Sequence, residues 1–171
     1  MEYTHKPVLL RQCLEGLNIR PGGTYVDGTL GRAGHALEIA KRLTTGRLIA
    51  IDRDKAALDA APARLEGHMD KVTLVRGNFG DLTEILSSLG VGGVDGMLFD
   101  LGVSSPQLDD GSRGFSYLQD APLDMRMDQS APLTARDVVN GWSQEELKHI
   151  LWQYGEERYS GQIAAAIVRA R

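Results

Sequence analysis

The chain has 171 residues, of which 42% are hydrophobic and 25% are charged, and it carries a formal charge of −4. This composition suits a globular domain with one core and excludes intrinsically disordered and fibrous proteins. The acidic balance argues mildly against a nucleic-acid partner, because most proteins that bind nucleic acids present a basic surface.

Cysteine content and the first residues bear on the compartment. Cys13 is the one cysteine in the sequence, so it can form neither an internal disulfide nor a cysteine-rich metal site. No apolar run of signal-peptide or membrane-span length follows residues 1–7. We therefore expect a cytoplasmic protein with no membrane partner and no metal site.

The first predicted element is an amphipathic helix. Apolar residues recur at helical intervals between Val8 and Leu17, and Pro7 would occupy the first turn, where a missing N–H is tolerated. A Pro-Gly-Gly turn at residues 21–23 then leads toward a strand.

A glycine-rich turn is the centre of the sequence. The β-forming residues 24–26 precede it, Gly28, Gly31 and Gly34 are spaced three residues apart, and apolar residues then recur at helical intervals. The pattern predicts a strand, a tight turn and a helix, which would bring bare backbone close to a ligand. Taken alone, it fits an ordinary strand-to-helix loop as well as a nucleotide site.

Three further apolar segments predict buried parallel strands. They span residues 47–51, 72–75 and 94–99, and such continuous hydrophobic runs are typical of strands covered on both faces. Single helices between them imply right-handed crossovers. The predicted fold class is therefore α/β, a doubly wound parallel sheet with the strand order 3-2-1-4.

The helices between these strands carry start and stop signals. Asp54 can cap one helix, although Pro62 should kink or shorten it. Asp81 and Glu84 have the spacing of a capping box and predict the start of the next helix.

The predicted strands end in polar or aromatic residues. In a sheet of this order the chain reverses direction beside the first strand, and ligands bind at the carboxyl ends of the strands near that point. Each acid alone is also consistent with a helix cap, but together they predict one crevice. The strand-end residues are Asp27, Asp52, Asn78, Phe79 and Asp100.

The sequence changes character after the fourth strand. Residues 101–122 are rich in Gly, Ser, Pro and Asp, and the remainder predicts helices at residues 134–140, from a Ser143 capping box to Gly155, and across residues 163–170. We place the domain boundary near Gly102, which gives a core domain at residues 1–102 and a helical domain at residues 103–171.

Asp52 indicates the kind of ligand. It lies about 20 residues after the glycine turn, where an acidic residue can accept hydrogen bonds from both hydroxyls of a ribose. An adenosine-containing ligand is expected, and an NAD-type dehydrogenase competes with an S-adenosylmethionine (SAM) methyltransferase. An acidic crevice suits the cationic SAM better than a pyrophosphate. A regulatory nucleotide-binding module also stays open.

Long strings in the second half of the sequence resemble those of a known family. They are Asp100–Asp109 (DLGVSSPQLD), Arg113–Tyr117 (RGFSY) and Asp120–Asp128 (DAPLDMRMD), with shorter matches at residues 5–10, 26–29 and 154–158. The chain thereby resembles the bacterial 16S ribosomal-RNA cytosine-N4 methyltransferases, the RsmH or MraW family, over its whole length. The resemblance implies transfer of a methyl group from SAM to the N4 amine of a cytidine in the decoding region of the small ribosomal subunit.

The resemblance also implies a fold and site residues. The fold would be a Rossmann-like, class I SAM-dependent methyltransferase, incomplete here and followed by part of an inserted helical domain. Asp100 would also be the candidate catalytic residue, because a carboxylate can accept a hydrogen bond from the amine; a backbone carbonyl near residues 104–106 is the alternative acceptor. By position, the cofactor contacts fall on Ala33, Gly34, His35, Asp52, Phe79, Asp100 and Gln107.

One residue departs from the family's pattern. The family usually has a second glycine at the position of Ala33. An alanine is harmless there if its φ angle is negative, whereas a positive φ would cost about 1 kcal/mol and crowd the cofactor.

The length of the chain gives the last expectations. Members of the family continue through further helices and strands, so this chain resembles roughly their N-terminal half. Residues 94–99 would then form an exposed sheet edge, through which we expect self-association. We also expect weak cofactor binding and no methylation by the chain alone, with Arg113 and Arg126 as the best candidates for RNA contacts.

Overall fold

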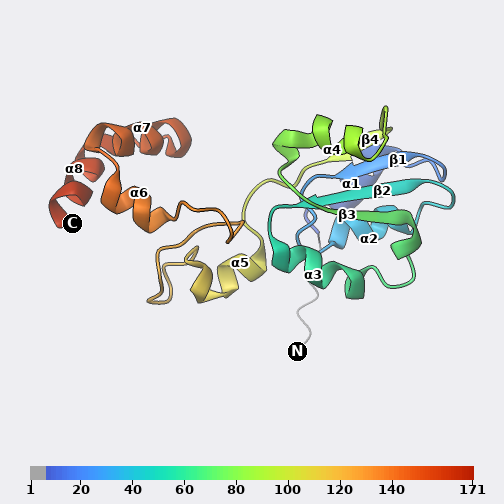
Figure 1. Ribbon diagram of the computed structural model, residues 1–171, viewed down its shortest axis with the longest axis horizontal. Coiled ribbons are helices and arrows are strands. Elements are labelled where there is room, and N and C mark those ends of the chain that lie inside the picture. Colours follow the sequence, from blue (N-terminus) through green and yellow to red (C-terminus); the bar gives the residue numbers. More distant parts are fainter. Residues whose placement is uncertain (1–6) are drawn as a thin grey trace. The chain divides into compact units, whose positions relative to one another are not determined.

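The computed structural model describes residues 7–171, whose elements are drawn in Figure 1. Contacts divide the chain into two compact units, Met1–Ser104 and Ser105–Arg171. The first unit is built on a sheet and the second is helical. Along residues 7–171, no helix combines the length and the apolar character needed to cross a bilayer.

The sheet of the first unit is parallel throughout and has the order β3-β2-β1-β4. Both the predicted α/β class and the predicted order are therefore confirmed. β1 is central, and its residue Val26 lies opposite Ile49 on one side and Met97 on the other. The strands are β1 (Thr24–Asp27), β2 (Arg47–Asp52), β3 (Val72–Arg76) and β4 (Gly96–Leu98).

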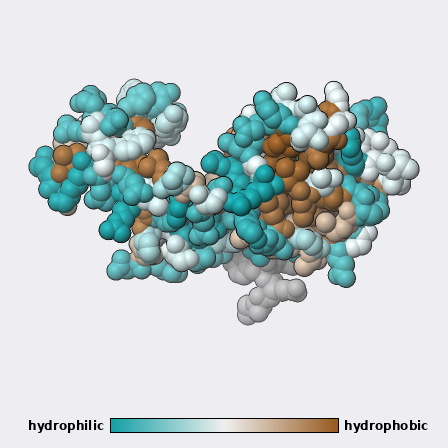
Figure 2. Space-filling model, viewed as in Figure 1, coloured by the Kyte–Doolittle hydropathy of each residue, from teal (hydrophilic) through white to brown (hydrophobic). Residues whose placement is uncertain are grey.

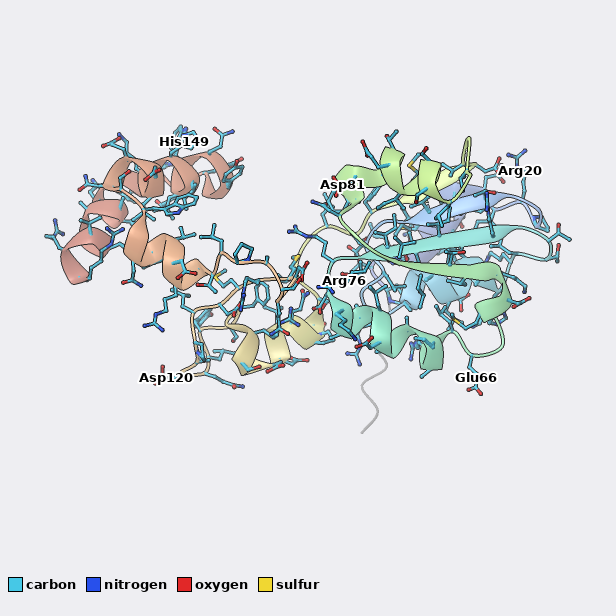
Figure 3. The ribbon with its side chains drawn as sticks, viewed as in Figure 1. Arg20, Glu66, Arg76, Asp81, Asp120 and His149 are labelled. Atoms are coloured by element: carbon cyan, nitrogen blue, oxygen red, sulfur yellow. The ribbon has the colours of Figure 1, made fainter. Side chains whose placement is uncertain are left out.

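β4 is shorter than the segment that the sequence predicted. Before the strand, Asp95 turns its carboxylate onto the first strand, where Oδ2 accepts the backbone N–H of Thr24 at 2.8 Å and Oδ1 pairs with Arg20. After the strand, the N–H of Asp100 donates to Thr29 Oγ1 at 2.6 Å. Side chains thus add to the backbone bonds Asp95 N–H to Thr24 O and Gly28 N–H to Leu98 O at the two ends. Figure 3 shows Arg20 at one end of the sheet and Arg76 at the other, carboxyl end.

Helices cover the two faces of the sheet unequally. α1 (Leu10–Leu17), α2 (Gly34–Ala40) and α3 (Lys55–Arg64) pack against one face, where Tyr25, Leu48 and Ile39 are fully buried. α4 (Leu82–Ser88) packs on the opposite face over Val26, Ile49 and Ile51, and none of its own residues is fully buried. Figure 2 shows apolar side chains gathered on that face beside α4.

One predicted helix start is confirmed without its capping bond, and another is wrong. α4 begins directly after Asp81, as predicted, but Asp81 makes no capping bond, because it ends a 3-10 turn, η2 (Phe79–Asp81), and lacks the extended backbone of a capping residue. Asn78 caps that turn instead and accepts the N–H of Gly80 at 3.0 Å. At the N-terminus, α1 begins at Leu10 rather than at Pro7, because Leu9 has a left-handed conformation with φ 49°.

Other local predictions are confirmed. Asp54 caps α3 by accepting the N–H of Ala56 at 3.0 Å. Pro62, which was expected to kink or shorten the helix, lies inside α3, and α3 ends two residues later at Arg64. In the second unit, Thr134 and Ser143 each form a complete capping box. The elements there are α5 (Ser105–Asp109), η3 (Gly111–Arg113), α6 (Ala135–Gly141), α7 (Gln144–Gly155) and α8 (Ser160–Ala170), of which α5 was not predicted.

The open edge at β4 predicts a specific pattern of amide exchange. Within residues 7–171, β4 pairs with β1 alone, so backbone groups on its other side lack a strand partner there. The N–H of Asp95 donates to β1, and N–H groups alternate along a strand, so those of Gly96 and Leu98 face the open side. We expect these two amides to exchange much faster than that of Ile49 in β2, while the bonded amides of Asp95 and Asp100 are slower. Hydrogen exchange followed by NMR measures this.

A dilution series supplies the control for that experiment. Exchange at Gly96 and Leu98 that slows as protein concentration rises would indicate the predicted self-association through this edge. Exchange as slow as that of Ile49 at every concentration would contradict an open edge.

Candidate functional site

The candidate site lies where the parallel strands end. β1 ends at Asp27, β2 ends at Asp52, and Asp100 follows β4 by two residues. Because β1 pairs with β2 on one side and β4 on the other, these ends meet at the switch point of the sheet. The structure therefore brings the three predicted carboxylates to one edge of the first unit.

The carboxylate of Asp52 holds the glycine-rich turn in place. Its Oδ2 accepts the backbone N–H of Gly31 at 2.8 Å, and its Oδ1 accepts the N–H of Asp54 at 2.9 Å. The N–H of Leu30 donates to the carbonyl of Ile51 at 3.0 Å. The turn is thus bonded to the end of β2, a role that the sequence analysis missed because spacing alone does not reveal it.

Asp27 is a buried acid with little solvation. Its side chain is 1% exposed, and Oδ1 accepts the N–H of Thr29 at 3.1 Å. Burial is the main cause that raises the pKa of Asp27 to about 7, and the charges of Asp52 and Asp100 add to it against the lowering effect of the Thr29 bond. Near neutral pH, a positive charge in the crevice would favour the ionised form.

The three predicted cofactor contacts at the start of α2, Ala33, Gly34 and His35, are packed closely against other parts of the first unit. Ala33 is fully buried, and its φ angle is positive, at 57°. The backbone is therefore strained at this alanine, and the family's glycine would fit it better. A Cβ on Gly34 would lie 2.5 Å from Cγ of Pro7. His35 is 7% exposed, and its Nε2 lies 3.0 Å from the carbonyl oxygen of Val8. His35 therefore joins α2 to the segment before α1.

Two phenylalanines pair at the same edge of the sheet. Phe79 follows β3 and Phe99 follows β4, and their ring centroids lie 5.4 Å apart with planes at 62°. The two side chains are 38% and 41% exposed, respectively. The sequence analysis identified Phe79 but counted Phe99 as part of a strand; its position directly before Asp100 was the available signal.

The remaining two predicted site residues, Asp100 and Gln107, belong to different units and differ in solvent exposure. Asp100 is exposed, and its backbone N–H is bonded to Thr29 Oγ1, which fixes the chain directly after β4. Gln107 belongs to the second unit, where it lies in α5 and is 6% exposed.

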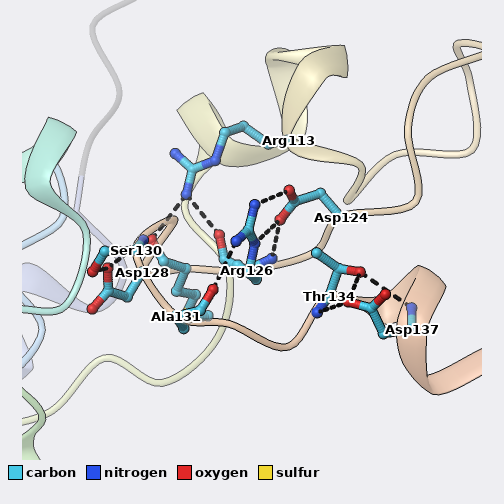
Figure 4. Close-up of polar contacts among 9 residues, drawn as sticks. Arg113, Asp124, Arg126, Asp128, Ser130, Ala131, Thr134 and Asp137 are labelled. Carbon is cyan, nitrogen blue, oxygen red and sulfur yellow. Dashed lines mark hydrogen bonds and ion pairs between the residues drawn. The ribbon is translucent and has the colours of Figure 1, made fainter.

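Two arginines that were expected to contact RNA form hydrogen bonds within the second unit (Figure 4). Arg113 is buried, and its Nη2 donates to the carbonyls of Arg126 and Met127 at 3.0 Å each. Arg126 donates to both oxygens of Asp124, at 2.9 and 2.7 Å, and lowers the pKa of that acid to about 2. Its Nη1 donates to the carbonyl of Ala131 at 2.7 Å. A contact of either residue with RNA stays a prediction.

Residues 7–171 contain no group of three or more His, Cys, Asp or Glu side chains placed to hold a metal ion.

A family model and several curated proteins match this chain over almost its whole length. Residues 2–171 match the model of the MraW methylase family. Curated proteins named "Ribosomal RNA small subunit methyltransferase H" are 59% identical in Brevibacillus brevis, 54% in Symbiobacterium thermophilum and 50% in Finegoldia magna, each over all of this chain. The chain spans about half the length of these relatives, 54% to 55%.

A solved structure supports the fold. The crystal structure of a Clostridium thermocellum protein, provisionally described as an rRNA-methylase, aligns with a TM-score of 0.51 at 22% identity. The alignment covers 56% of this chain and 52% of that protein. At this identity the likeness concerns architecture, and it agrees with an incomplete class I methyltransferase sheet.

The buried acid predicts an unusual dependence of stability on pH. The pKa of Asp27 is about 7 in the folded state against 3.8 in an unfolded chain. The folded state therefore holds the proton more tightly, so stability should fall as pH rises from about 4 to about 7 and stay low above that. Between about pH 5 and pH 8 the loss should be roughly 2 to 3 kcal/mol.

Asp27→Asn should remove that loss, because an amide does not ionise. Urea unfolding at several pH values measures it, with Asp59→Asn, an exposed acid of α3, as the matched control. If the stability difference between Asp27→Asn and wild type does not grow with pH, the shifted pKa is wrong.

Proposed function

This chain belongs to the MraW methylase family, and on that basis we propose that it forms the cofactor-binding part of a SAM-dependent rRNA methyltransferase. The methyl acceptor would be the N4 amine of a cytidine in 16S ribosomal RNA. On this proposal the partner is the small ribosomal subunit and the protein works in the cytoplasm.

The acidic switch point is the observation that supports SAM most directly. Asp27, Asp52 and Asp100 lie at adjacent strand ends, and within residues 7–171 no cationic side chain contacts the Asp27 carboxyl. The sulfonium and ammonium groups of SAM are cationic, so they would offset this charge. A dinucleotide would instead bring a negatively charged pyrophosphate toward the acids.

The aromatic and polar residues fit the adenosine part of such a ligand. Phe79 is exposed enough to pack against an adenine ring. Each oxygen of Asp52 accepts one backbone N–H, and a carboxylate has about four acceptor sites in all. Asp52 could therefore hold the turn and accept bonds from ribose hydroxyls as well. Ala33, Gly34, His35 and Gln107 complete the proposed contacts, the first and third through backbone groups.

In the proposed mechanism, the chain mainly orients the reactants. SAM supplies a methyl group already activated by its sulfonium, and the neutral thioether of S-adenosylhomocysteine leaves. The cytidine amine is a weak nucleophile because its lone pair is delocalised into the ring. The carboxylate of Asp100 would accept a hydrogen bond from an amine N–H, which favours a pyramidal nitrogen, and would take up the proton that this nitrogen loses.

A ligand comparison tests the proposed function. NMR titrations of the chain with SAM, S-adenosylhomocysteine, NAD and ATP should show that the first two bind, even if weakly, and at least about tenfold more tightly than NAD and ATP. The physical reason is the charge of the crevice. A preference for NAD would instead favour a dehydrogenase, and a preference for ATP a regulatory module.

The ribose contact of Asp52 has its own test. If the carboxylate binds the ribose, removing the 2′-hydroxyl from S-adenosylhomocysteine should weaken its binding to wild type by about tenfold or more. The same change in the ligand should have no effect on binding to Asp52→Ala or Asp52→Asn, because the partner is already gone.

Comparing the two ligands on wild type and on the Asp52 variants separates ribose binding from the role of Asp52 in the turn. Loss of the turn lowers the affinity for both ligands equally, so it does not imitate the expected result. Asp59→Ala, which alters an exposed acid, is the control. An equal effect of the 2′-hydroxyl in wild type and variants would assign Asp52 to the turn alone.

A further inference from the structure

Gly28 leaves room for an aromatic ring. A Cβ built on Gly28 would lie 2.3 Å from Cε1 and 2.5 Å from Cδ1 of Phe99, and 3.4 Å from Cβ of Phe79. Gly28 is not among the positive-φ glycines of the described residues. The glycine is thus required for space rather than for an unusual backbone conformation, and the ring of Phe99 occupies the position where a side chain would stand.

Two hydrogen bonds fix the backbone on either side of Phe99. The N–H of Gly28 donates to the carbonyl of Leu98 at 2.9 Å, and the N–H of Asp100 donates to Thr29 Oγ1 at 2.6 Å. Both bonds reach the same glycine turn. The backbone of Phe99 is therefore fixed from both neighbours, and its ring lies over Gly28.

From this position, Phe99 meets Phe79, which comes from a different strand. β1 and β2 separate β4 from β3 in the sheet, so the pair spans the switch point. The rings contact edge to face, an arrangement in which each ring limits the rotation of the other. Both side chains stay about two-fifths exposed, which is unusual for aromatic residues in a fixed pair and leaves apolar surface beside Asp100.

We propose that Phe99 is a cofactor-positioning residue, which holds the ring of Phe79 in the orientation that packs against the adenine, and that Gly28 is required to seat Phe99. This inference rests on the proposed function, because it assumes an adenosine-containing ligand at Phe79. It adds a role for two residues that the glycine turn and the strand pattern did not assign.

The test is a double-mutant cycle on the affinity for S-adenosylhomocysteine. Phe99→Leu should weaken binding by about three- to tenfold, the size of an aromatic pair contribution. In a Phe79→Leu background the same substitution should have no further effect, because Phe99 acts through Phe79. Phe99→Tyr keeps the ring and should bind within about twofold of wild type.

The ligand-free protein gives a second readout. The side-chain rotamer of Phe79, measured from three-bond couplings, should become averaged in Phe99→Leu and in Gly28→Ala, which displaces the ring of Phe99, but not in Met97→Ala. Met97 is an exposed apolar residue of β4, 46% exposed, and is the matched control. If Gly28→Ala does not fold, Phe99→Leu alone tests the positioning role, because this substitution introduces no clash.

The outcomes separate this inference from the proposed function. If wild type binds S-adenosylhomocysteine but Phe99→Leu binds equally well, or if the effects of Phe79→Leu and Phe99→Leu add, the positioning role is overturned and the function stands. If wild type does not bind this ligand at all, the proposed function fails and the inference fails with it.

Discussion

The glycine turn depends on one carboxylate that bonds to two segments of backbone. Asp52 accepts the N–H of Gly31 and the N–H of Asp54, and so joins the turn after β1 to the start of α3. Hydrogen bonds to a charged acceptor contribute about 1.5 to 3 kcal/mol each, more than a neutral pair. With the turn fixed, the chain passes the switch point in one conformation, and Gly28 and Thr29 can hold the segment after β4.

The concentration of acids at this edge carries a cost in stability. Asp27 is almost fully buried, and the charges of Asp52 and Asp100 raise its pKa further. Buried like charges destabilise a fold unless a ligand offsets them, and such arrangements are enriched at functional sites. The same edge carries two exposed aromatic rings, from Phe79 and Phe99. A pair of exposed aromatic rings beside acidic side chains suits a ligand that is flat in one part and cationic in another.

The two units differ in how they are stabilised. The first has a continuous apolar core around β1 and β2, with three helices on one face of the sheet. In the second, charged groups fix the loop before α6, where the guanidiniums of Arg113 and Arg126 bond to backbone carbonyls and to Asp124. Polar contacts thus stabilise this loop, whereas the first unit depends on its apolar core.

The sequence by itself determined the α/β class, the strand order and several helix caps, because hydrophobic periodicity and capping act between residues close in the chain. Tertiary structure decided the site. The positive φ of Ala33, the contact of His35 with Val8, the raised pKa of Asp27 and the pairing of Phe79 with Phe99 all depend on segments distant in sequence. Such contacts depend on how strands and turns are packed, which no local pattern encodes.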